Sequence, residues 1–501
     1  MPQYPELVIG LVGPIGCPIH EAGDALAAAF KAMDYSPTSI HLSREMDRLL
    51  LAKKAEIPSD GESILENKIK KGNAVRTAFK NDSVLAAEAI RQIVEFRKQN
   101  ARDMGYVTDD DIDARALIPL DRKVFIIHQL KREEEIELLN RVFGKRFIQV
   151  SVVNALDDRK SALVARLQSE QPGWDLEKCE VHSAKLIKTD QNESLQDRGQ
   201  RISKIFHLGD VFINGNSEAA LQRSSMRFVE SLFGRNSISP SRDEFGSYMA
   251  KAASLRSVDL SRQVGAAIMT KEGDIISVGC NEVPKFGGGN YWDDDPDEVK
   301  RRDIDMGGEA NKSEVNRIVF NFIEVLSKQG LMKGDKSTQD ILEDPEHRKA
   351  IKKSLIGGIT EYGRMVHAEM NALSDAVRLG RSVRGATIYV TTYPCHNCAK
   401  HLIASGVDRI VFIEPYPKSK AESLFKDILA PDKENSDVVS IEHFFGISPR
   451  RYRDIFEKEM RQTSDGEVQK WYKGFPEPRL GSLAVGVSGS EIQAIVENLY
   501  S

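Results

Sequence analysis

The chain has 501 residues, of which 41% are hydrophobic and 29% are charged, a balance that is typical of globular proteins and excludes collagen-like and disordered chains. At about 150 residues per domain, this length predicts roughly two to four domains. The 70 basic and 75 acidic residues give a formal net charge of −5, which argues against a protein that binds nucleic acid mainly through its charge. The N-terminus lacks the basic start of a signal peptide, and no apolar run reaches the roughly 18 residues of a spanning helix. We therefore expect a cytoplasmic protein that does not enter a membrane.

The first half of the chain alternates strand-like and helix-like segments. Alternation of this kind predicts a parallel sheet covered by helices on both faces, here an α/β domain over residues 1–235. The predicted strands are Leu7–Val12, Ser39–Leu42, Val124–Ile127, Phe147–Val153 and Asp210–Asn214, and the predicted helices are His20–Met33, Ser83–Lys98 and Glu133–Phe143.

A glycine-rich turn containing Gly10, Gly13 and Gly16 joins the first strand to the first helix. This is the position of a phosphate-binding loop. The residues Pro18, Ile19 and His20 stand where such a loop has Gly, Lys and Ser or Thr, so phosphoryl transfer is not expected. Backbone amides can still bind an anion, which makes the three glycines candidate nucleotide-binding residues. A tight turn without any ligand is the alternative.

Loop-like composition at residues 234–241 marks a domain boundary, and we assign residues 240–501 to a second α/β domain. This domain is predicted to contain an insertion at about residues 285–360, because residues 283–363 are mostly polar. The predicted strands are Gly265–Met269, Asp274–Gly279, residues 386–392, residues 408–413 and Ile441–Phe445, and the predicted helices are Arg242–Leu255, Val315–Lys328, residues 367–379 and residues 396–405.

The strongest chemical signal is the pair of motifs His367-Ala-Glu369 and Pro394-Cys395-His-Asn-Cys398. One imidazole and two thiolates are suitable ligands for tetrahedral Zn²⁺, and they leave the fourth position to water, as in a catalytic site. The residue Glu369 is close to the ligands without being one, and can act as the proton carrier of a zinc deaminase. Both motifs precede predicted helices, whose N-termini favour thiolates.

Taken alone, the Cys-x-x-Cys motif also fits a structural zinc site or a redox pair. A structural site requires a fourth protein ligand, for which His396 and His401 are candidates. The position of His396 between the two cysteines makes simultaneous ligation awkward. The combined motifs favour the catalytic interpretation.

Residues 242–415 resemble the cytidine/deoxycytidylate deaminase family. Besides the metal motifs, the resemblance rests on Ser261–Ile268, which looks like the first hairpin strand of that family, and on Gly279–Pro284, which looks like its Gly-Tyr-Asn-x-x-Pro segment. The resemblance implies that Asn281 contacts the sugar of a nucleotide. A turn residue at the end of a strand is the alternative interpretation of Asn281.

Residues 1–230 resemble a P-loop nucleotide-kinase fold. A chain in which such a kinase-like half is followed by a deaminase-like half resembles the bacterial antiphage dCTP deaminases. Segments Glu361–Asn371 and Ile413–Ser419 look like that family too. The implied fold is an N-terminal P-loop kinase-like parallel sheet followed by a C-terminal cytidine-deaminase-like α/β/α domain. The resemblance further implies a homo-oligomer, a regulatory nucleotide at the P-loop-like domain, and an inhibitory RNA or protein before infection.

The leading functional prediction is a zinc-dependent hydrolase that deaminates dCTP, dCMP or both, and so depletes dCTP in antiphage defence. The cationic partners expected for the phosphates are Arg262 and Lys418, chosen from a wider set with Lys285, Arg364 and Lys420. One alternative is a deaminase of cytosine or adenine in RNA or single-stranded DNA. The negative net charge and the lack of a basic stretch with interleaved aromatic residues count against it. Another alternative is a nucleotide sensor without catalysis, against which the intact metal and Glu369 motifs argue.

Overall fold

The computed structural model describes residues 4–191, 198–332, 337–354, 356–359, 362–431, 437–480 and 490–500. The chain forms two compact units, each of which is described by itself. One unit combines Met1–Phe245 with His443–Ser501, and the other consists of Gly246–Glu442. None of the described helices is both long and apolar enough to span a membrane.

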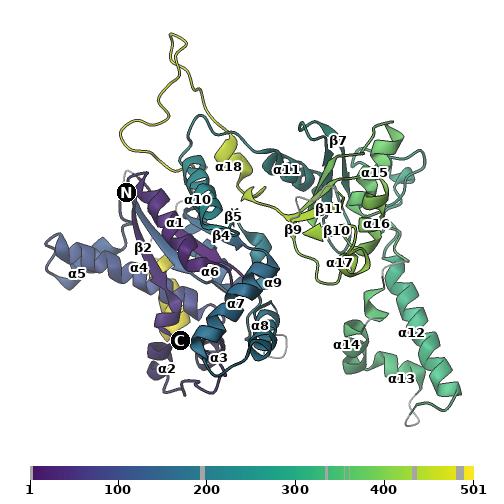
Figure 1. Cartoon of the computed structure of the whole chain (residues 1–501), viewed down its shortest axis with the longest axis horizontal. Helices are drawn as coiled ribbons and strands as arrows, with labels where there is room; N and C mark the ends of the chain where they lie inside the picture. The colour runs from purple at the N-terminus through teal and green to yellow at the C-terminus, as the bar shows by residue number, and fades with distance from the viewer. Residues whose placement is uncertain are drawn as a thin grey trace. The chain divides into compact units, whose positions relative to one another are not determined.

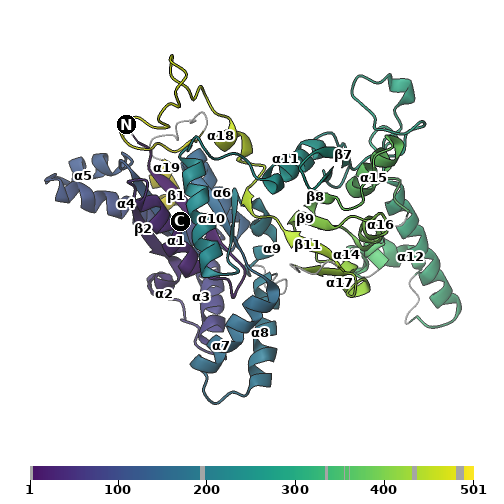
Figure 2. The same cartoon turned by 45° about the horizontal axis from the view of Figure 1, so that its top comes forward.

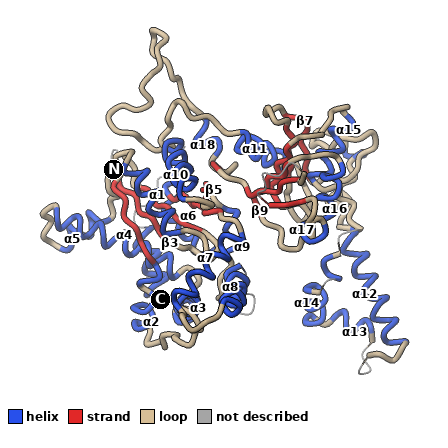
Figure 3. Tube along the Cα trace, in the orientation of Figure 1, coloured by secondary structure: helices blue, strands red, loops and turns tan. Residues whose placement is uncertain are grey.

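A six-stranded sheet in the order β12-β5-β4-β1-β3-β2 forms the centre of the first unit (Figure 3). The first five strands in chain order run parallel, and the short β12 pairs antiparallel with β5. Central strands β1 and β4 are buried along their whole length, as expected when helices cover both faces of a parallel sheet. The strands are β1 (Leu7–Val12), β2 (Ser36–His41), β3 (Lys123–His128), β4 (Phe147–Val153), β5 (Val211–Asn214) and β12 (Gly446–Ile447).

Successive residues of a strand point to opposite faces of the sheet, and β3 shows what covers each face. The side chain of Ile126 belongs to a core cluster with Phe30 of α1 and Phe228 of α10, two helices that lie side by side in Figures 1 and 2. The preceding Phe125 contacts Phe96 of α4, with ring centroids 5.5 Å apart. The helices of this unit are α1 (Ile19–Lys31), α2 (Met46–Ala52), α3 (Ile64–Ala78), α4 (Val84–Asp103), α5 (Asp109–Ala116), α6 (Glu133–Phe143), α7 (Leu156–Glu170), α8 (Leu176–Gln191), α9 (Ile202–Ile205), α10 (Glu218–Leu232), α18 (Tyr452–Phe456) and α19 (Ser490–Ile495).

The carboxy-terminal part of the chain differs from the expected division, in which residues 240–501 form one domain. The structure places His443–Ser501 with the first unit. The physical reason is that Ile447 and Ile455 are buried in the core beside α1 and α10, and that β12 extends the first sheet. The expected boundary at residues 235–240 lies close to the observed division within α11 (Arg242–Ser254).

The second unit contains a sheet in the order β10-β11-β9-β8-β6-β7. Strand β6 pairs antiparallel with β7 and with β8, and β8 pairs parallel with β9. Helix α15 packs on β6 and β7. The strands are β6 (Gly265–Met269), β7 (Ile275–Cys280), β8 (Thr387–Thr392), β9 (Arg409–Glu414), β10 (Leu429–Pro431) and β11 (Val439–His443), and the helices are α12 (Ala310–Lys328), α13 (Thr338–Glu343), α14 (Pro345–Lys353), α15 (Ala368–Arg378), α16 (His396–Ala404) and α17 (Ala421–Leu424).

The predicted insertion contains helices α12, α13 and α14, of which α13 contacts both others, and they project away from the sheet of their own unit (Figure 1). Only part of α12 was predicted from the sequence. The helix α14 has no buried residue, so no apolar stripe identifies it. In the first unit, the sequence analysis also missed α2, α3, α5, α7, α8, α9, α10, α18 and α19.

A buried ion pair connects the start of the chain to α4 in the first unit, and we expect it to matter for stability. The side chains of Arg97 and Glu6 are both fully buried, with Nη2 and Oε1 2.5 Å apart. Removing one partner of a buried pair typically costs about 3–5 kcal/mol, because the other charge stays buried. Arg97→Met is therefore expected to lower the stability of this unit by about that amount.

Hydrogen exchange of the amides in β1, β3 and β4 measures this loss in the full chain. The matched control is Arg453→Met, which breaks an exposed pair with Glu457 and should cost less than about 1 kcal/mol. Equal exchange rates in the two variants would contradict the role assigned to the Arg97–Glu6 pair.

Candidate active site

Three soft or borderline metal ligands meet at the N-termini of two helices in the second unit. The residue His367 caps α15, and Cys395 caps α16 while Cys398 lies in its first turn. The Nδ1 atom of His367 lies 3.5 Å from Sγ of Cys395 and 3.4 Å from Sγ of Cys398. One ligand atom from each of the three residues lies within 4.8 Å of the others. The donor set and its spacing fit a tetrahedral zinc ion with its fourth position open.

Local backbone features place these ligands. The segment before α15 is held to the end of β7 by paired backbone hydrogen bonds between Val366 and Glu282, of 2.9 and 3.2 Å. Helix α15 then lies directly on β7, where a Cβ at Gly279 would come within 2.3 Å of the carbonyl oxygen of Ala368. Only glycine allows this approach, so Gly279 sets the position of the helix that carries the first ligand.

The two thiols differ in acidity in the absence of an ion. The hydrogen bond with Cys398, followed by the one with His367, lowers the pKa of Cys395 to about 4 despite burial. The same hydrogen bond with Cys395 raises the pKa of Cys398. Since the thiolate is the form that binds metals, Cys395 is ready to receive an ion at neutral pH, and binding must displace the proton of Cys398.

Glu369 lies in the first turn of α15 and lines the same cavity as His367 and Cys395. Its side chain is almost completely buried, at 4% exposure. Burial raises the pKa of this carboxyl group above its usual range. Chemically, it is placed to accept and return a proton beside the metal site.

The cavity has a volume of about 280 Å³, near the lower end of the range for small-molecule sites. Its wall includes His367, Glu369 and Cys395, and also two of the predicted substrate-binding residues, Asn281 and Arg262. A small, partly apolar cavity next to a metal site suits one heterocyclic ring with polar substituents.

The predicted substrate residues have distinct surroundings. The side-chain Nδ2 of Asn281 donates to Oδ2 of Asp259 at 3.3 Å and to the carbonyl oxygen of Arg262 at 3.2 Å, so it fixes the loop that forms one wall of the cavity. The guanidinium of Arg262 is paired with Glu414 at 2.7 Å and is half exposed. The third predicted residue, Lys418, is exposed and is not part of the cavity wall. The roles of all three residues toward substrate stay predictions.

Several cavity residues were not predicted. Asp303, Glu309 and Asn311 come from the start of the insertion, where no periodic pattern or motif indicates a site. The residue Tyr416 also lines the cavity. Its signal was available, because it lies within the family-like segment Ile413–Ser419.

The three glycines of the first unit each have a packing role. A Cβ at Gly10 would lie 2.6 Å from Cδ1 of Leu130, and one at Gly13 would lie 2.3 Å from Cδ1 of Ile19. The backbone of Gly16 has φ of +88°, which L-residues rarely adopt. Nucleotide binding by Gly10, Gly13 and Gly16 stays a prediction.

A carboxylate already contacts this glycine-rich loop. The backbone N–H of Ile15 donates to Oδ2 of Asp190 at 2.7 Å, and Lys131 pairs with the same carboxylate at 2.7 Å while donating to the carbonyl oxygen of Gly13 at 3.1 Å. A phosphate at this amide would have to compete with Asp190.

Replacement of Asn281 by Ala tests its contribution to the cavity. We expect the KM for the substrate to rise by roughly tenfold, because loss of a hydrogen bond in a buried site costs about 1–3 kcal/mol. Steady-state kinetics at full zinc occupancy measure this change. Ser277→Ala is a matched control, since Ser277 lies on β7, which ends just before Asn281, and donates to the carbonyl oxygen of Ala372 outside the cavity. If the two variants have the same KM, Asn281 has no part in binding.

Comparison with known proteins supports a zinc-binding site at these motifs. Residues 240–414 match the family described as the cytidine and deoxycytidylate deaminase zinc-binding region. Over 167 residues the chain is 34% identical to the deoxycytidylate deaminase of Enterobacteria phage T4, which covers 32% of this chain and 71% of the phage protein. It is 31% identical to a probable deoxycytidylate deaminase of Caenorhabditis elegans, over 33% of this chain and 54% of that protein. ComE operon protein 2 of Bacillus subtilis is 41% identical over 13% of this chain and 34% of its own length.

Among solved structures, the dCMP deaminase of cyanophage S-TIM5 aligns with 41% of this chain and 100% of its own, at 15% identity and a TM-score of 0.22. Such a TM-score is too low to support a structural conclusion. The sequence matches cover the segment that carries both metal motifs, and they reach two thirds of the length of the phage T4 enzyme. The chain therefore belongs to the family of cytidine and deoxycytidylate deaminases, hydrolytic enzymes that act on nucleotides.

Proposed function

We propose that this chain converts the cytosine of a free deoxycytidine nucleotide, dCMP or dCTP, into uracil and releases ammonia. The C4–N4 bond of the ring breaks, a C4–O bond to the oxygen of water forms, and the amino group leaves as ammonia. The observation that supports the proposal best is the position of Glu369, a buried carboxyl group in one small cavity with His367 and Cys395.

The residues His367, Cys395 and Cys398 would hold the zinc ion of the family. When bound, zinc supplies a Lewis acid that lowers the pKa of a water molecule toward neutrality. The Glu369 carboxylate would take one proton from the attacking water and give it to N3, where it stays in the uracil product, and would then pass the second proton of that water to the amino group that leaves as ammonia. Because Glu369 is buried, its proton is exchanged with the substrate in preference to bulk solvent.

For the phosphates, the cavity wall offers two guanidinium groups. The side chain of Arg262 is half exposed, and Arg364 is more than one-third exposed beside Asp303, at 2.8 Å. Each guanidinium group already pairs with a carboxylate, so a phosphate that binds there would have to replace that carboxylate. Discrimination between dCMP and dCTP then depends on how readily Glu414 and Asp303 release these arginines.

Initial rates with dCMP, dCTP and a cytosine-containing single-stranded oligonucleotide test the substrate class. The zinc-loaded full chain is expected to release ammonia from at least one of the mononucleotides and not from the oligonucleotide. A higher rate on the oligonucleotide would overturn the proposal in favour of nucleic-acid editing.

We further propose that this activity depletes dCTP during phage infection and is held off beforehand, with the first unit as a regulatory or assembly module. The proposal rests on the resemblance to antiphage dCTP deaminases. In infected cells, the wild-type chain should lower the dCTP pool and protect against phage, and Glu369→Ala should do neither. Protection by Glu369→Ala would instead assign the chain to nucleotide sensing without catalysis.

A further inference from the structure

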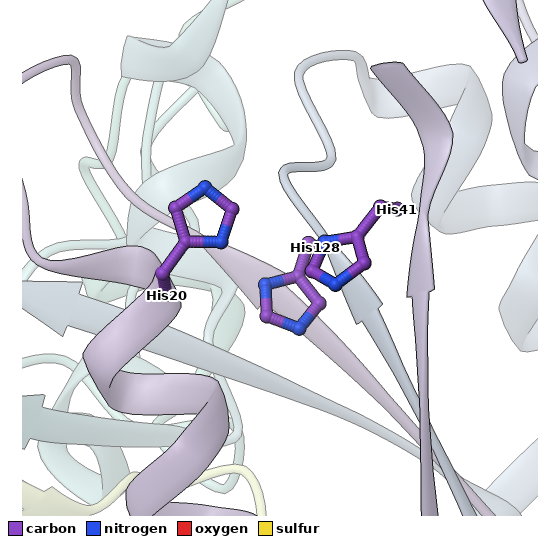
Figure 4. A group of neighbouring side chains, drawn as sticks. All are labelled: His20, His41 and His128. Atoms are coloured by element: carbon purple, nitrogen blue, oxygen red, sulfur yellow. The ribbon is translucent and has the colours of Figure 1, made fainter. Parts of the chain in front are cut away.

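Three histidines gather at the carboxyl ends of two neighbouring strands in the first unit (Figure 4). The residues His41 and His128 end the neighbouring parallel strands β2 and β3 and are directly opposite each other in the strand register. The residue His20 lies at the start of α1. The carboxyl ends of parallel strands are the usual ligand-binding edge of an α/β sheet.

The three rings are close enough to share an ion. Ring centroids lie 4.2 Å apart for His41 and His128, 5.4 Å for His20 and His128, and 5.5 Å for His20 and His41. One nitrogen from each ring lies within 4.8 Å of the other two. Around tetrahedral zinc, ligand nitrogens are about 3.3 Å apart. The exposed His20 can rotate to close the remaining distance.

Burial of His128 provides an independent indication of a ligand. The side chain is only 4% exposed, yet neither ring nitrogen has a hydrogen-bond partner among the described residues. An unpaired buried polar group costs about 1–3 kcal/mol, and such groups usually bind an unseen water or ion. The fold also makes room for this ring, because a Cβ at Gly23 of α1 would lie 2.4 Å from its Cε1 atom.

Two of the three rings, those of His41 and His128, have lowered pKa values. Burial, followed by the proximity of His41 and His20, lowers the pKa of His128 to about 3. Burial, followed by Arg44, also lowers the pKa of His41, against a weaker opposite effect of Asp24. Neutral imidazole is the form that binds metals. At neutral pH the two rings at the strand ends are therefore available as ligands without loss of a proton.

All three histidines line a cavity of about 320 Å³ that also includes Gly16 and Cys17 of the glycine-rich loop. We propose that His20, His41 and His128 bind a transition-metal ion of the Zn²⁺ class and leave one coordination position open to this cavity. Three imidazoles with an open fourth position form a known type of zinc site. The ion would occupy the edge of the sheet where the glycine-rich loop lacks the lysine and hydroxyl group of a working phosphate-binding loop.

A second group in the same unit, formed by Glu62, Glu66 and His182, is a weaker candidate. Both of its carboxylates pair with Lys185 at 3.1 Å, so the acidic ligands are already neutralised. Among the described residues no ion pair occupies the three imidazoles of the histidine cluster, and the cation that acts on it is Arg44, which helps to lower the pKa values of His41 and His128.

Zinc content of the purified full chain tests the proposal. After equilibration with zinc and removal of free metal, wild-type protein should hold zinc at both sites. The variant His20→Ala/His41→Ala should keep zinc only at the deaminase site, and Cys395→Ser/Cys398→Ser only at the histidine cluster. Since His20 is exposed and His41 partly exposed, the double histidine variant should not create a cavity in the hydrophobic core.

Cobalt substitution identifies the ligands at each site. In the Cys395→Ser/Cys398→Ser variant, cobalt should give visible bands without thiolate charge transfer, and His20→Ala/His41→Ala in that background should abolish them. The control His207→Gln removes another histidine of the same unit and should bind as much metal as wild type. Wild-type zinc content in the double histidine variant, or no metal in the double cysteine variant, would overturn the proposal.

Discussion

Replacing Glu369 by Gln is expected to lower kcat for deoxycytidine-nucleotide deamination by about 10²–10⁴-fold, the usual contribution of a positioned acid–base group. The amide of Gln has nearly the shape of the carboxylate but cannot take or return a proton. Because Glu369 is not one of the three ligands, zinc content should stay at the wild-type level. Kinetics and metal analysis on the same preparation measure both quantities.

The matched control is Asp375→Asn, which makes the same chemical change on the same helix at an ion pair with Arg378. Its kcat should stay close to that of wild type. A Glu369→Gln variant with wild-type kcat and full zinc would show that proton transfer is carried by another group.

The second large effect is expected for Cys398→Ala, which removes a buried thiolate ligand. Even changes to groups that only orient a ligand reduce metal affinity by about 10–100-fold, so loss of the ligand itself should exceed that. We expect zinc to be lost from the deaminase site and deamination to become undetectable. Zinc is measured in a His20→Ala/His41→Ala background, so that only the zinc at the deaminase site is counted and not zinc at the proposed histidine cluster.

The control for this experiment is Cys179→Ala. Its thiol is also completely buried but lies on α8 in the first unit. Zinc at the deaminase site and the deamination rate should both be unchanged. Full activity in Cys398→Ala would remove this cysteine from the ligand set and reopen the alternative of a redox pair.

Strong local patterns made the core of each sheet predictable from the sequence. Strands β1, β3 and β4 are short apolar runs whose burial requires helices on both faces, and the structure contains them. The convergence of His367, Cys395 and Cys398 was predictable because these residues stand at the N-termini of two helices, which local sequence motifs indicate. The apolar strands and the two metal motifs were therefore enough to predict the sheet of the first unit and a zinc site in the second.

Long-range packing explains what the sequence did not reveal. The short strand β12 gives no pattern of its own, and its place beside β5 depends on the burial of Ile447 in a core that forms elsewhere in the chain. The histidine cluster unites residues from one helix and two strands, and only the register between β2 and β3 brings His41 opposite His128. The wall contributed by Asp303, Glu309 and Asn311 likewise depends on how the insertion returns toward the sheet.

Isotope labelling gives the most direct test of hydrolytic deamination at this site. The zinc-loaded full chain is incubated with dCMP or dCTP in ¹⁸O-labelled water, and the nucleotide product is analysed by mass spectrometry together with the released ammonia. The account predicts a uracil nucleotide that carries the label at O4 and ammonia in equal amount, with both absent for Glu369→Gln. Ammonia without labelled uracil, or no product from either nucleotide at full zinc occupancy, would contradict it.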